Sequence, residues 1–232
     1  MIDFDKCLDT RPKKIAIIGM GRSAYYYIAS RNRAQGVSEI PDEVWGINFT
    51  NEWLKADKIF LMDGIEALSG RGWSDWAERQ KTSTVPIITP VKLPDFPCTV
   101  QYPLEWVIET VKEWREFHST VCYMVAYAIA IGVKRIDLFG CDFEYPDKKV
   151  VDEQGNVYSN VGETGKSALT FWLGIAVGRG IAVNNVFGSL LNTGEGWFYG
   201  YPEHMQPKIT VRRAEDSDAA GGSTESAERE RG

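Results

Sequence analysis

A glycine-rich turn near the start of the chain combines residue types that can hold a phosphate group. The apolar run Ile15–Ile18 is typical of a buried parallel strand, and Gly19-Met20-Gly21-Arg22-Ser23 follows it directly. Helix-compatible residues continue from Ala24 to Arg31. A strand, a tight turn and a helix in this order direct backbone N–H groups and a helix N-terminus toward an anion.

Each residue of this turn suggests a role in binding the phosphate of a nucleotide. Gly19 can adopt the positive φ that a tight turn needs, and Gly21 has no Cβ to keep a phosphate away. Ser23 adds a hydroxyl donor at the helix start. We therefore predict that Gly19, Gly21, Arg22 and Ser23 bind a nucleotide through bare main-chain amides. The string also fits the dinucleotide fingerprint G-x-G-x-x-[G/A], and a strand–helix turn that binds nothing is the alternative.

Polar residues also follow three other predicted strands, where open α/β sheets bind their ligands. Asn48 ends the second strand, Asp63 follows the third, and Asp142 comes shortly after a later one. A dehydrogenase of the NAD type usually has an acidic residue in place of Asn48, so the asparagine argues against that activity. Asn48 can still hydrogen-bond a ribose or a base. Turn formation and helix capping are the structural alternatives for these residues.

A hydroxyl pair, Ser119-Thr120, precedes the most regular predicted helix, Val121–Ile131, which Gly132 is expected to end as a C-cap. Serine and threonine are typical N-cap residues, and hydroxyls at a helix N-terminus can also contact a phosphate. Both roles are compatible. If the sheet is doubly wound, the hydroxyl pair and the residues at the strand ends should converge on one crevice.

A second glycine-rich string, Gly162–Ser167, lies at the end of a polar segment, 144–165. It resembles the end of a Walker A loop, but Asn160 stands where the leading glycine belongs and no buried strand precedes it. We therefore predict that it is not the phosphate loop of an ATPase. The segment 144–165 is expected to be a lid or an active-site loop. Lys166 can neutralise a diphosphate, and an exposed lysine in a polar loop is the alternative.

The alternation of apolar strand and helix patterns predicts an α/β fold with a doubly wound, mostly parallel, Rossmann-like sheet and helices on both faces. The expected strands are 15–18, 44–49, 58–62, 85–89, 136–140 and 181–185, and the expected helices are 24–33, 73–81, 104–117, 121–131 and 168–179. The expected organisation is a polar leader (1–12), one nucleotide-binding domain (13–205), and an extension with a disordered C-terminal tail (206–232).

Composition limits the classes of function. The net charge of −6 argues against broad nucleic-acid binding by the whole surface. The four cysteines are too far apart for a zinc signature, and no cluster of His, Cys and carboxylate residues has metal-ligand spacing, so we predict no metal site. No G-x-S-x-G elbow marks a hydrolase serine. We find neither a signal peptide nor an apolar run of the ~18–20 residues that a membrane span needs. A cytoplasmic protein without a membrane span is expected.

Four short motifs in the same order resemble a known group of proteins. Ile17–Ser23, Trp45–Asn48, Ser119–Met124 and Ile136–Phe143 are similar to motifs of bacterial CMP-sialic-acid-dependent sialyltransferases. Related flagellin-glycosylation proteins (motility-associated factors) and 6-hydroxymethylpterin diphosphokinase-like proteins share them. The resemblance runs from about residue 14 to 191. It implies a nucleotide-dependent transferase with a CMP-type nucleotide or nucleotide-sugar as donor, and a nucleotide contact for Asn48.

The chain also departs from these motifs. Arg22 replaces a proline, and Val121 replaces the glycine that follows the hydroxyl pair. The sialyltransferases have a general-base histidine in a loop that here reads Asn160 to Ser167 without one. An acceptor hydroxyl must lose its proton as the new bond forms. Asp142 and Glu163 are therefore the predicted catalytic residues.

Three functions remain open from the sequence. Transfer of a sugar from a nucleotide-sugar is the first choice, ATP-dependent and Mg²⁺-dependent pyrophosphoryl transfer is the second, and a non-catalytic nucleotide-binding module is the third. The expected partner is a small-molecule nucleotide donor. The acceptor and a homo-oligomeric state stay open, and an origin in a phage or mobile element is compatible with the sequence.

Overall fold

The computed structural model of the protein describes residues 3–33, 40–63, 74–143, 149–151 and 157–185. The chain divides into two units, Met1–Asn192 and Thr193–Gly232, and the described residues all belong to the first. The predicted extension and tail, 206–232, lie outside the described residues.

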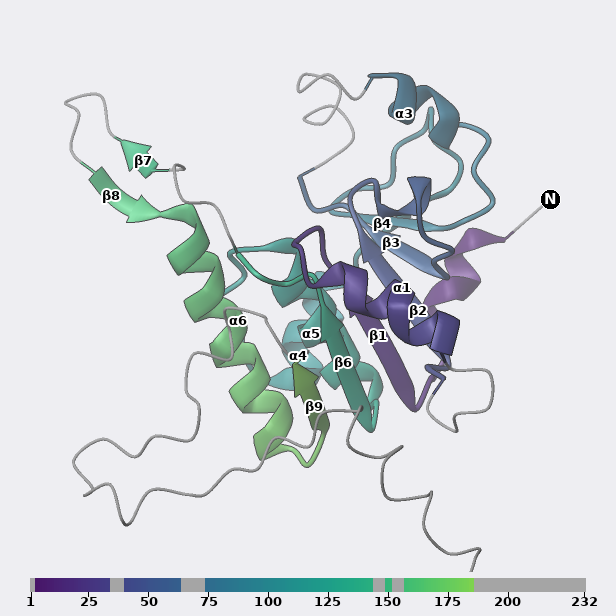
Figure 1. Ribbon diagram of the computed structural model, residues 1–232. Coiled ribbons are helices and arrows are strands. Elements are labelled where there is room, and N and C mark those ends of the chain that lie inside the picture. Colours follow the sequence, from purple (N-terminus) through teal and green to yellow (C-terminus); the bar gives the residue numbers. More distant parts are fainter. Residues whose placement is uncertain (1–2, 34–39, 64–73, 144–148, 152–156, 186–232) are drawn as a thin grey trace, which may run out of the picture. The chain divides into compact units, whose positions relative to one another are not determined.

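Seven parallel strands form the central sheet in the order β5-β4-β3-β2-β1-β6-β9 (Figure 1). At its centre, Ile17 is paired with Trp45 on one side and with Leu138 on the other. The strands are β1 (Lys14–Ile18), β2 (Glu43–Ile47), β3 (Lys58–Phe60), β4 (Ile87–Thr89), β5 (Thr99–Gln101), β6 (Arg135–Phe139) and β9 (Ala182–Asn185). The short apolar runs form parallel strands because both faces of the sheet are buried.

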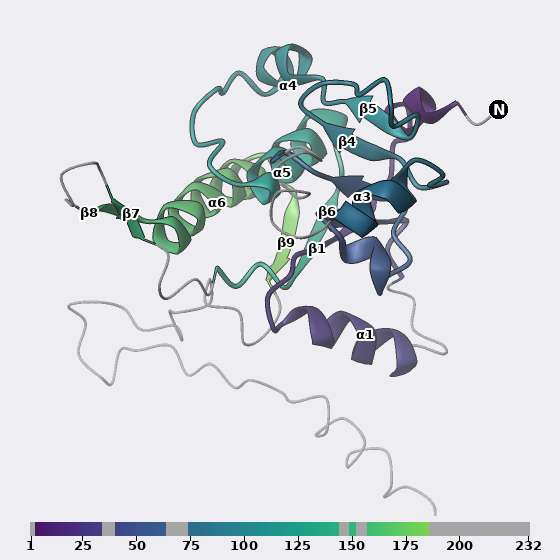
Figure 2. The same cartoon turned by 90° about the horizontal axis from the view of Figure 1, so that it is seen from above.

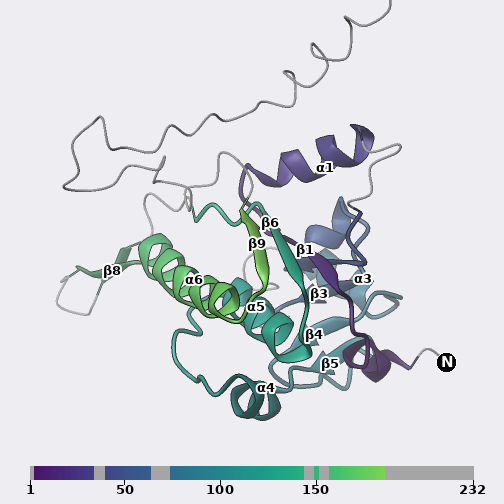
Figure 3. The same cartoon turned by 90° about the horizontal axis from the view of Figure 1, so that it is seen from below.

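Helices cover both faces of the sheet (Figures 2 and 3). One face carries α1 (Ala24–Arg33) and α3 (Ser74–Gln80), and the other carries α4 (Leu104–Val111), α5 (Thr120–Ile131) and α6 (Val161–Gly178). Alternate residues of β1 divide between the two layers, as the strand period of two requires. The predicted doubly wound α/β fold is therefore confirmed. Among the described helices, none has both the length and the apolar character that crossing a bilayer requires.

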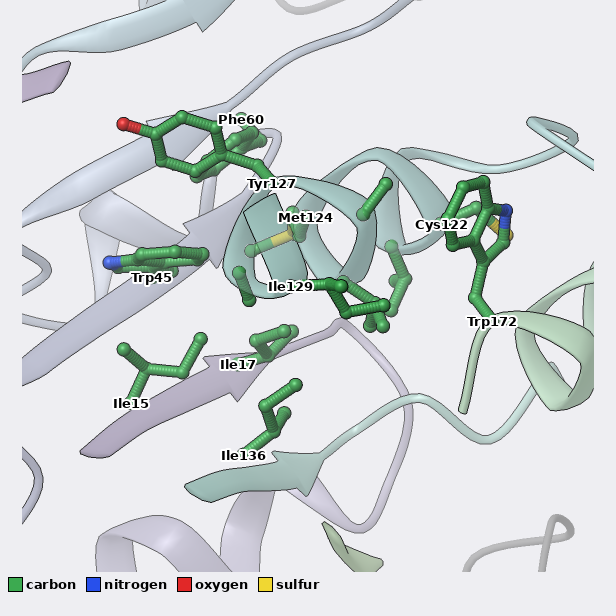
Figure 4. Packing of buried hydrophobic residues seen from close by; sticks show 14 of the residues in the cluster. Ile15, Ile17, Trp45, Phe60, Cys122, Met124, Tyr127, Ile129, Ile136 and Trp172 are labelled. Atoms are coloured by element: carbon green, nitrogen blue, oxygen red, sulfur yellow. The ribbon is translucent and has the colours of Figure 1, made fainter. Parts of the chain in front are cut away.

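The largest core cluster surrounds α5, which is apolar on nearly all sides (Figure 4). Tyr127 of α5 lies against Trp45 of β2, with ring centroids 5.6 Å apart, and Trp172 of α6 is fully buried. The helix ends at Gly132, whose φ of 77° is the left-handed C-cap conformation that the sequence predicts. Because α5 leads directly into β6 and runs in the direction opposite to that strand, the N-terminus of α5 lies at the carboxyl edge of the sheet.

Several boundaries differ from the predictions. The helix expected over 104–117 ends at Val111, because Lys112 adopts a left-handed conformation with φ 58°. The structure adds a short strand, β5, within 90–103, where four prolines suggest an irregular connection. It also adds an antiparallel pair, β7 (Lys149–Val151) and β8 (Val157–Asn160), in the segment 144–165. Helix α6 begins at Val161 and not at Ala168. Whether this segment covers a site stays a prediction.

The N-terminal leader packs against the sheet. A short 3₁₀ helix (Phe4–Leu8) directs apolar side chains toward the core, and Tyr127 donates a hydrogen bond to the Leu8 carbonyl at 3.0 Å. Lys58 is 1% exposed, forms an ion pair with Glu43, and donates to Thr10 Oγ1 at 2.7 Å. A buried ammonium needs partners for its protons, so Thr10 connects the leader to the sheet.

We expect Thr10→Val to lower the free energy of unfolding by about 1–2 kcal/mol, because one N–H of buried Lys58 loses its acceptor. Urea denaturation measures this change. Thr170→Val is the matched control, since exposed Thr170 donates to the Lys166 carbonyl of its own helix. This change should alter stability by no more than about 0.5 kcal/mol. Equal stability of the two variants would show that the leader is not held by this bond.

Candidate functional site

The sheet reverses its strand order between β1 and β6. The chain runs from β1 outward to β5, then returns to form β6 on the other side of β1. The segments after β1 and β6 leave toward α1 and α6, on opposite faces. Ligands of doubly wound sheets bind outside the carboxyl ends of the strands at such a switch point. Asp63, Asn48, Gly19 and Asp142 follow β3, β2, β1 and β6, which are neighbours in this order, so all four lie at this edge.

The glycine-rich turn after β1 is hydrogen-bonded to the segment that follows β6. The Gly19 amide donates to the Phe139 carbonyl at 2.7 Å, and the Gly21 amide donates to the Gly140 carbonyl at 2.8 Å. A Cβ on Gly19 would lie 2.6 Å from the Gly140 carbonyl carbon and closer still to its oxygen. Gly19 is therefore required for a close backbone approach. The prediction that it adopts a positive φ is wrong, because this contact is made without one.

Asp142 holds the turn from the other side. Its Oδ2 accepts from the Ser23 amide at 2.7 Å and its Oδ1 accepts from Ser23 Oγ at 2.5 Å. Ser23 Oγ in turn accepts from the Gly140 amide at 2.7 Å. Asp142 is 2% exposed, and a Cβ on Gly21 would lie 2.8 Å from its Cβ and Cγ. Gly21 thus leaves room for a carboxylate of the same chain.

This network corrects one expectation. The amides of Gly19, Gly21 and Ser23 were predicted to be bare for a phosphate, and all three donate to acceptors within the protein. The reason is that acceptors from the β6 side occupy the place that an anion would take. The catalytic role of Asp142 stays a prediction, although Ser23 engages both of its oxygens.

Asn48 combines strain with an unsatisfied polar atom. Its φ of 50° is left-handed, an uncommon conformation for a residue other than glycine. Its backbone amide donates to the Phe60 carbonyl at 3.0 Å, and its Nδ2 lies 3.8 Å from Met20 Sδ in the glycine-rich turn. Its Oδ1 is buried and has no hydrogen-bond partner in the described part of the chain. A buried acceptor without a donor costs free energy, which a ligand N–H or O–H can recover.

The hydroxyl pair begins α5 at the same edge. Ser119 is the N-cap, as predicted, but its side chain makes no capping hydrogen bond and its Oγ lies 3.2 Å from Cys122 Sγ. Thr120 is the first helical residue, and both are half-buried. Burial is the largest cause of the raised pKa of Cys141, followed by the charge of Asp142. The nearby Cys122 thiol makes a smaller contribution in the same direction. The first turn of α5 is therefore near the Asp142 network.

The remaining predicted residues differ in how closely the structure connects them to this network. Phe143 packs on Gly165, whose Cβ would lie 2.6 Å from the Phe143 ring, so the first turns of α6 lie beside the residue that follows Asp142. Glu163, exposed, and Lys166, half-buried, belong to these turns. Arg22 and Asp63 are exposed. Asp63 follows β3, two strands from β1, roughly 10 Å away across the sheet.

Sequence reasoning gave no role to His118, which directly precedes the hydroxyl pair. Its Nε2 lies 3.6 Å from Glu116 Oε2. The sequence feature that could have indicated His118 is its position one residue before Ser119, the N-cap of α5. In the described ranges, no three His, Cys, Asp or Glu side chains are grouped in a way that could hold a metal ion.

The buried thiols of Cys98, Cys122 and Cys141 and the half-buried thiol of Cys7 give a prediction for alkaline pH. Burial raises the pKa of Cys7, Cys98 and Cys122 to about 11, and raises the pKa of Cys141 further. Between the ordinary thiol pKa and these values, the folded state holds more protons than the unfolded chain. Stability should therefore be fully present below about pH 8.5 and decline as pH rises toward 11.

Urea denaturation at pH 8 and pH 10 measures this decline, and Ellman's reagent measures thiol access. The native protein should react slowly at pH 8, and the urea-unfolded protein should react with all four cysteines at once. Native thiols that react as fast as unfolded ones would contradict the burial of these side chains.

No protein family model and no curated protein sequence matches the chain. Solved structures similar to it are bacterial sialyltransferases. CstII from Campylobacter jejuni in complex with cytidine-5'-monophosphate is 19% identical, with 77% of this chain and 82% of that chain covered and a TM-score of 0.44. An α-2,3-sialyltransferase from Campylobacter jejuni in apo form is 20% identical, with 77% of each chain covered and a TM-score of 0.44. Cst-I from the same organism is 16% identical, with 90% and 92% covered and a TM-score of 0.42. Likenesses this remote assign no ligand and no residue role.

Proposed function

We propose that the protein is a nucleotide-dependent transferase that moves a sugar from a CMP-type donor. The observation that carries the proposal concerns Asn48, at the edge of the sheet where the strand order reverses. Its backbone is left-handed, and its buried Oδ1 accepts no hydrogen bond from the described part of the chain. Strain and unsatisfied polar atoms persist where function requires them. A nucleoside that donates an N–H or O–H to Asn48 Oδ1 would satisfy this atom.

The phosphate of the donor would lie at the N-terminus of α5. The positive end of the helix dipole favours an anion there, and the hydroxyls of Ser119 and Thr120 can donate to it. The exposed guanidinium of Arg22 and the ammonium of Lys166 would add positive charge. The glycine-rich turn, held in place by Asp142, would form one wall of the site, and its main-chain amides would not bind the phosphate.

Two carboxylates at this edge would serve the acceptor side. Asp142 would hold the turn in shape, because both of its oxygens are already hydrogen-bonded to Ser23. Glu163, which is exposed in the first turn of α6, would contact the acceptor. The order of the four sequence motifs supports a CMP-type donor. The occupied carboxylate of Asp142 favours, as second candidate, a module that binds a nucleotide without consuming it.

A donor panel tests the proposal. The full chain is incubated with CMP-, UDP- and GDP-sugars and with ATP, each with and without Mg²⁺, and consumption of the donor is measured. Thermal shifts with CMP, UMP, GMP, ADP and NAD are recorded in parallel. We expect CMP to raise the melting temperature and a CMP-sugar to be consumed, since a ligand at 100 times its Kd stabilises by about 2.7 kcal/mol.

The other outcomes decide between the alternatives. Consumption of ATP that requires Mg²⁺ would identify a pyrophosphokinase. A thermal shift with CMP and no consumption of any donor would identify a binding module. No shift with any nucleotide would contradict the proposed site.

A further inference from the structure

A histidine and a carboxylate are paired between α4 and α5. His118 Nε2 lies 3.6 Å from Glu116 Oε2, and both side chains are partly exposed, at 53% and 40%. The pair can therefore reach a substrate. The arrangement matches a general base whose positive charge, once it takes a proton, is stabilised by a neighbouring carboxylate.

The backbone that carries this pair is held on two helices. Glu116 has a left-handed φ of 64°, and its carbonyl accepts from Trp172 Nε1 of α6 at 3.0 Å. The ring of Phe117 lies 4.8 Å from that of Trp172 and 4.6 Å from that of Tyr123 in α5, measured between centroids. The residues before and within the pair are thus positioned by packing and not by a free loop.

The pair lies beside the candidate site. His118 immediately precedes Ser119, the N-cap of α5, whose Oγ contacts Cys122 in the first turn. The N-terminus of α5 lies at the carboxyl edge of the sheet, and Cys122 is near Cys141, which precedes Asp142. The histidine is therefore next to the hydroxyls proposed to hold the donor phosphate.

Sugar transfer needs such a group. The acceptor oxygen forms a bond to the anomeric carbon while the bond from that carbon to the CMP phosphate oxygen breaks. The electron pair of the broken bond remains on the phosphate, and the acceptor hydroxyl must give up its proton. Asp142 is already bonded through both oxygens, and imidazole is the side chain suited to accept a proton near neutral pH.

We propose that His118 is the general base of the transfer and that Glu116 stabilises its imidazolium form. This inference rests on the proposed function. Nε2 of His118 lies 3.6 Å from Glu116 Oε2, which leaves Nδ1 to take the proton from the acceptor. With His118 in this role, Glu163 contacts the acceptor but does not remove its proton.

The test measures CMP release from CMP-sialic acid by the full chain, with lactose or with water alone as acceptor. His118→Gln should lower kcat at least about 100-fold, the usual contribution of a general base, with KM for the donor within about twofold. Imidazole should partly restore His118→Ala. Glu116→Gln should lower kcat about two- to fivefold, as expected for an exposed ion pair. Glu78→Gln, which changes the exposed carboxylate that pairs with Lys81 on α3, is the control and should keep the wild-type kcat.

Each other result is decisive. A His118→Gln variant with wild-type kcat, or one that loses CMP binding by calorimetry together with activity, would overturn the role of His118 and leave the proposed function standing. A wild-type protein that releases CMP neither from CMP-sialic acid nor from any other CMP-sugar of the donor panel would overturn the proposed function, and the role of His118 with it.

Discussion

Replacing Gly19 by alanine should lower the free energy of unfolding by more than about 4 kcal/mol, one of the largest effects expected in the chain. The added Cβ would lie 2.6 Å from the Gly140 carbonyl carbon and still closer to its oxygen. These are backbone atoms at the junction of β1 and β6, and the Gly19 amide bonds to Phe139 in the same place. The two central strands would have to separate.

Chemical denaturation of the full chain measures this effect, and Gly174→Ala is the matched control. Gly174 lies in α6, and a Cβ there would meet nothing within 4 Å. The same substitution should therefore raise stability by up to about 1 kcal/mol, the helix-propensity difference between glycine and alanine. If Gly19→Ala and Gly174→Ala were equally stable, the close approach of the two turns would be incorrect.

Replacing Asp142 by asparagine should cost about 3 kcal/mol, because hydrogen bonds to a charged group are each worth about 1.5–3 kcal/mol. The carboxylate accepts from the Ser23 amide through Oδ2 and from Ser23 Oγ through Oδ1. The asparagine side chain has the same size but only one oxygen, so it cannot accept both hydrogen bonds in this way. One buried donor of Ser23 would lose its partner. Ser23→Ala removes the hydroxyl from the other side of the same contact.

A double-mutant cycle isolates this interaction. The costs of Asp142→Asn and Ser23→Ala should not add, with a coupling energy of about 1–3 kcal/mol, since the two side chains share a network. Asp95→Asn, at an exposed carboxylate, should change stability by no more than about 0.5 kcal/mol. Additive costs would mean that Asp142 does not fix the glycine-rich turn.

The sequence was sufficient for the fold because its strongest signals are local. Short apolar runs separated by amphipathic or apolar helices specify a parallel sheet, and Gly132 marks the end of α5 as expected. Edge strand β5 was missed because four prolines (Pro90, Pro94, Pro97, Pro103) suggest an irregular connection, yet Thr99–Gln101 contains none. The early start of α6 was missed because Gly162 and Gly165 weaken the helix signal. In the structure, Gly165 packs on Phe143 instead.

The site was less accessible from the sequence because its contacts join distant segments. The position of Asn48 at a strand end follows from the apolar pattern, but its left-handed conformation and its buried oxygen do not. Ser23 and Asp142 are 119 residues apart, and only the pairing of β1 with β6 brings them together. For that reason the glycine-rich turn was interpreted as a phosphate cradle, although its amides serve the fold.

The CMP affinity of Asn48→Gly, compared with that of the wild type by calorimetry, tests the candidate site most directly. Glycine adopts a φ of 50° without strain, and the substitution also removes a buried oxygen that has no hydrogen-bond donor in the described part of the chain. The variant should therefore be at least as stable as the wild type. We predict that its affinity for CMP falls about tenfold, the value of a lost hydrogen bond to the nucleotide. An Asn48→Gly variant that binds CMP as tightly as the wild type would contradict the assignment of this edge of the sheet as the nucleotide site.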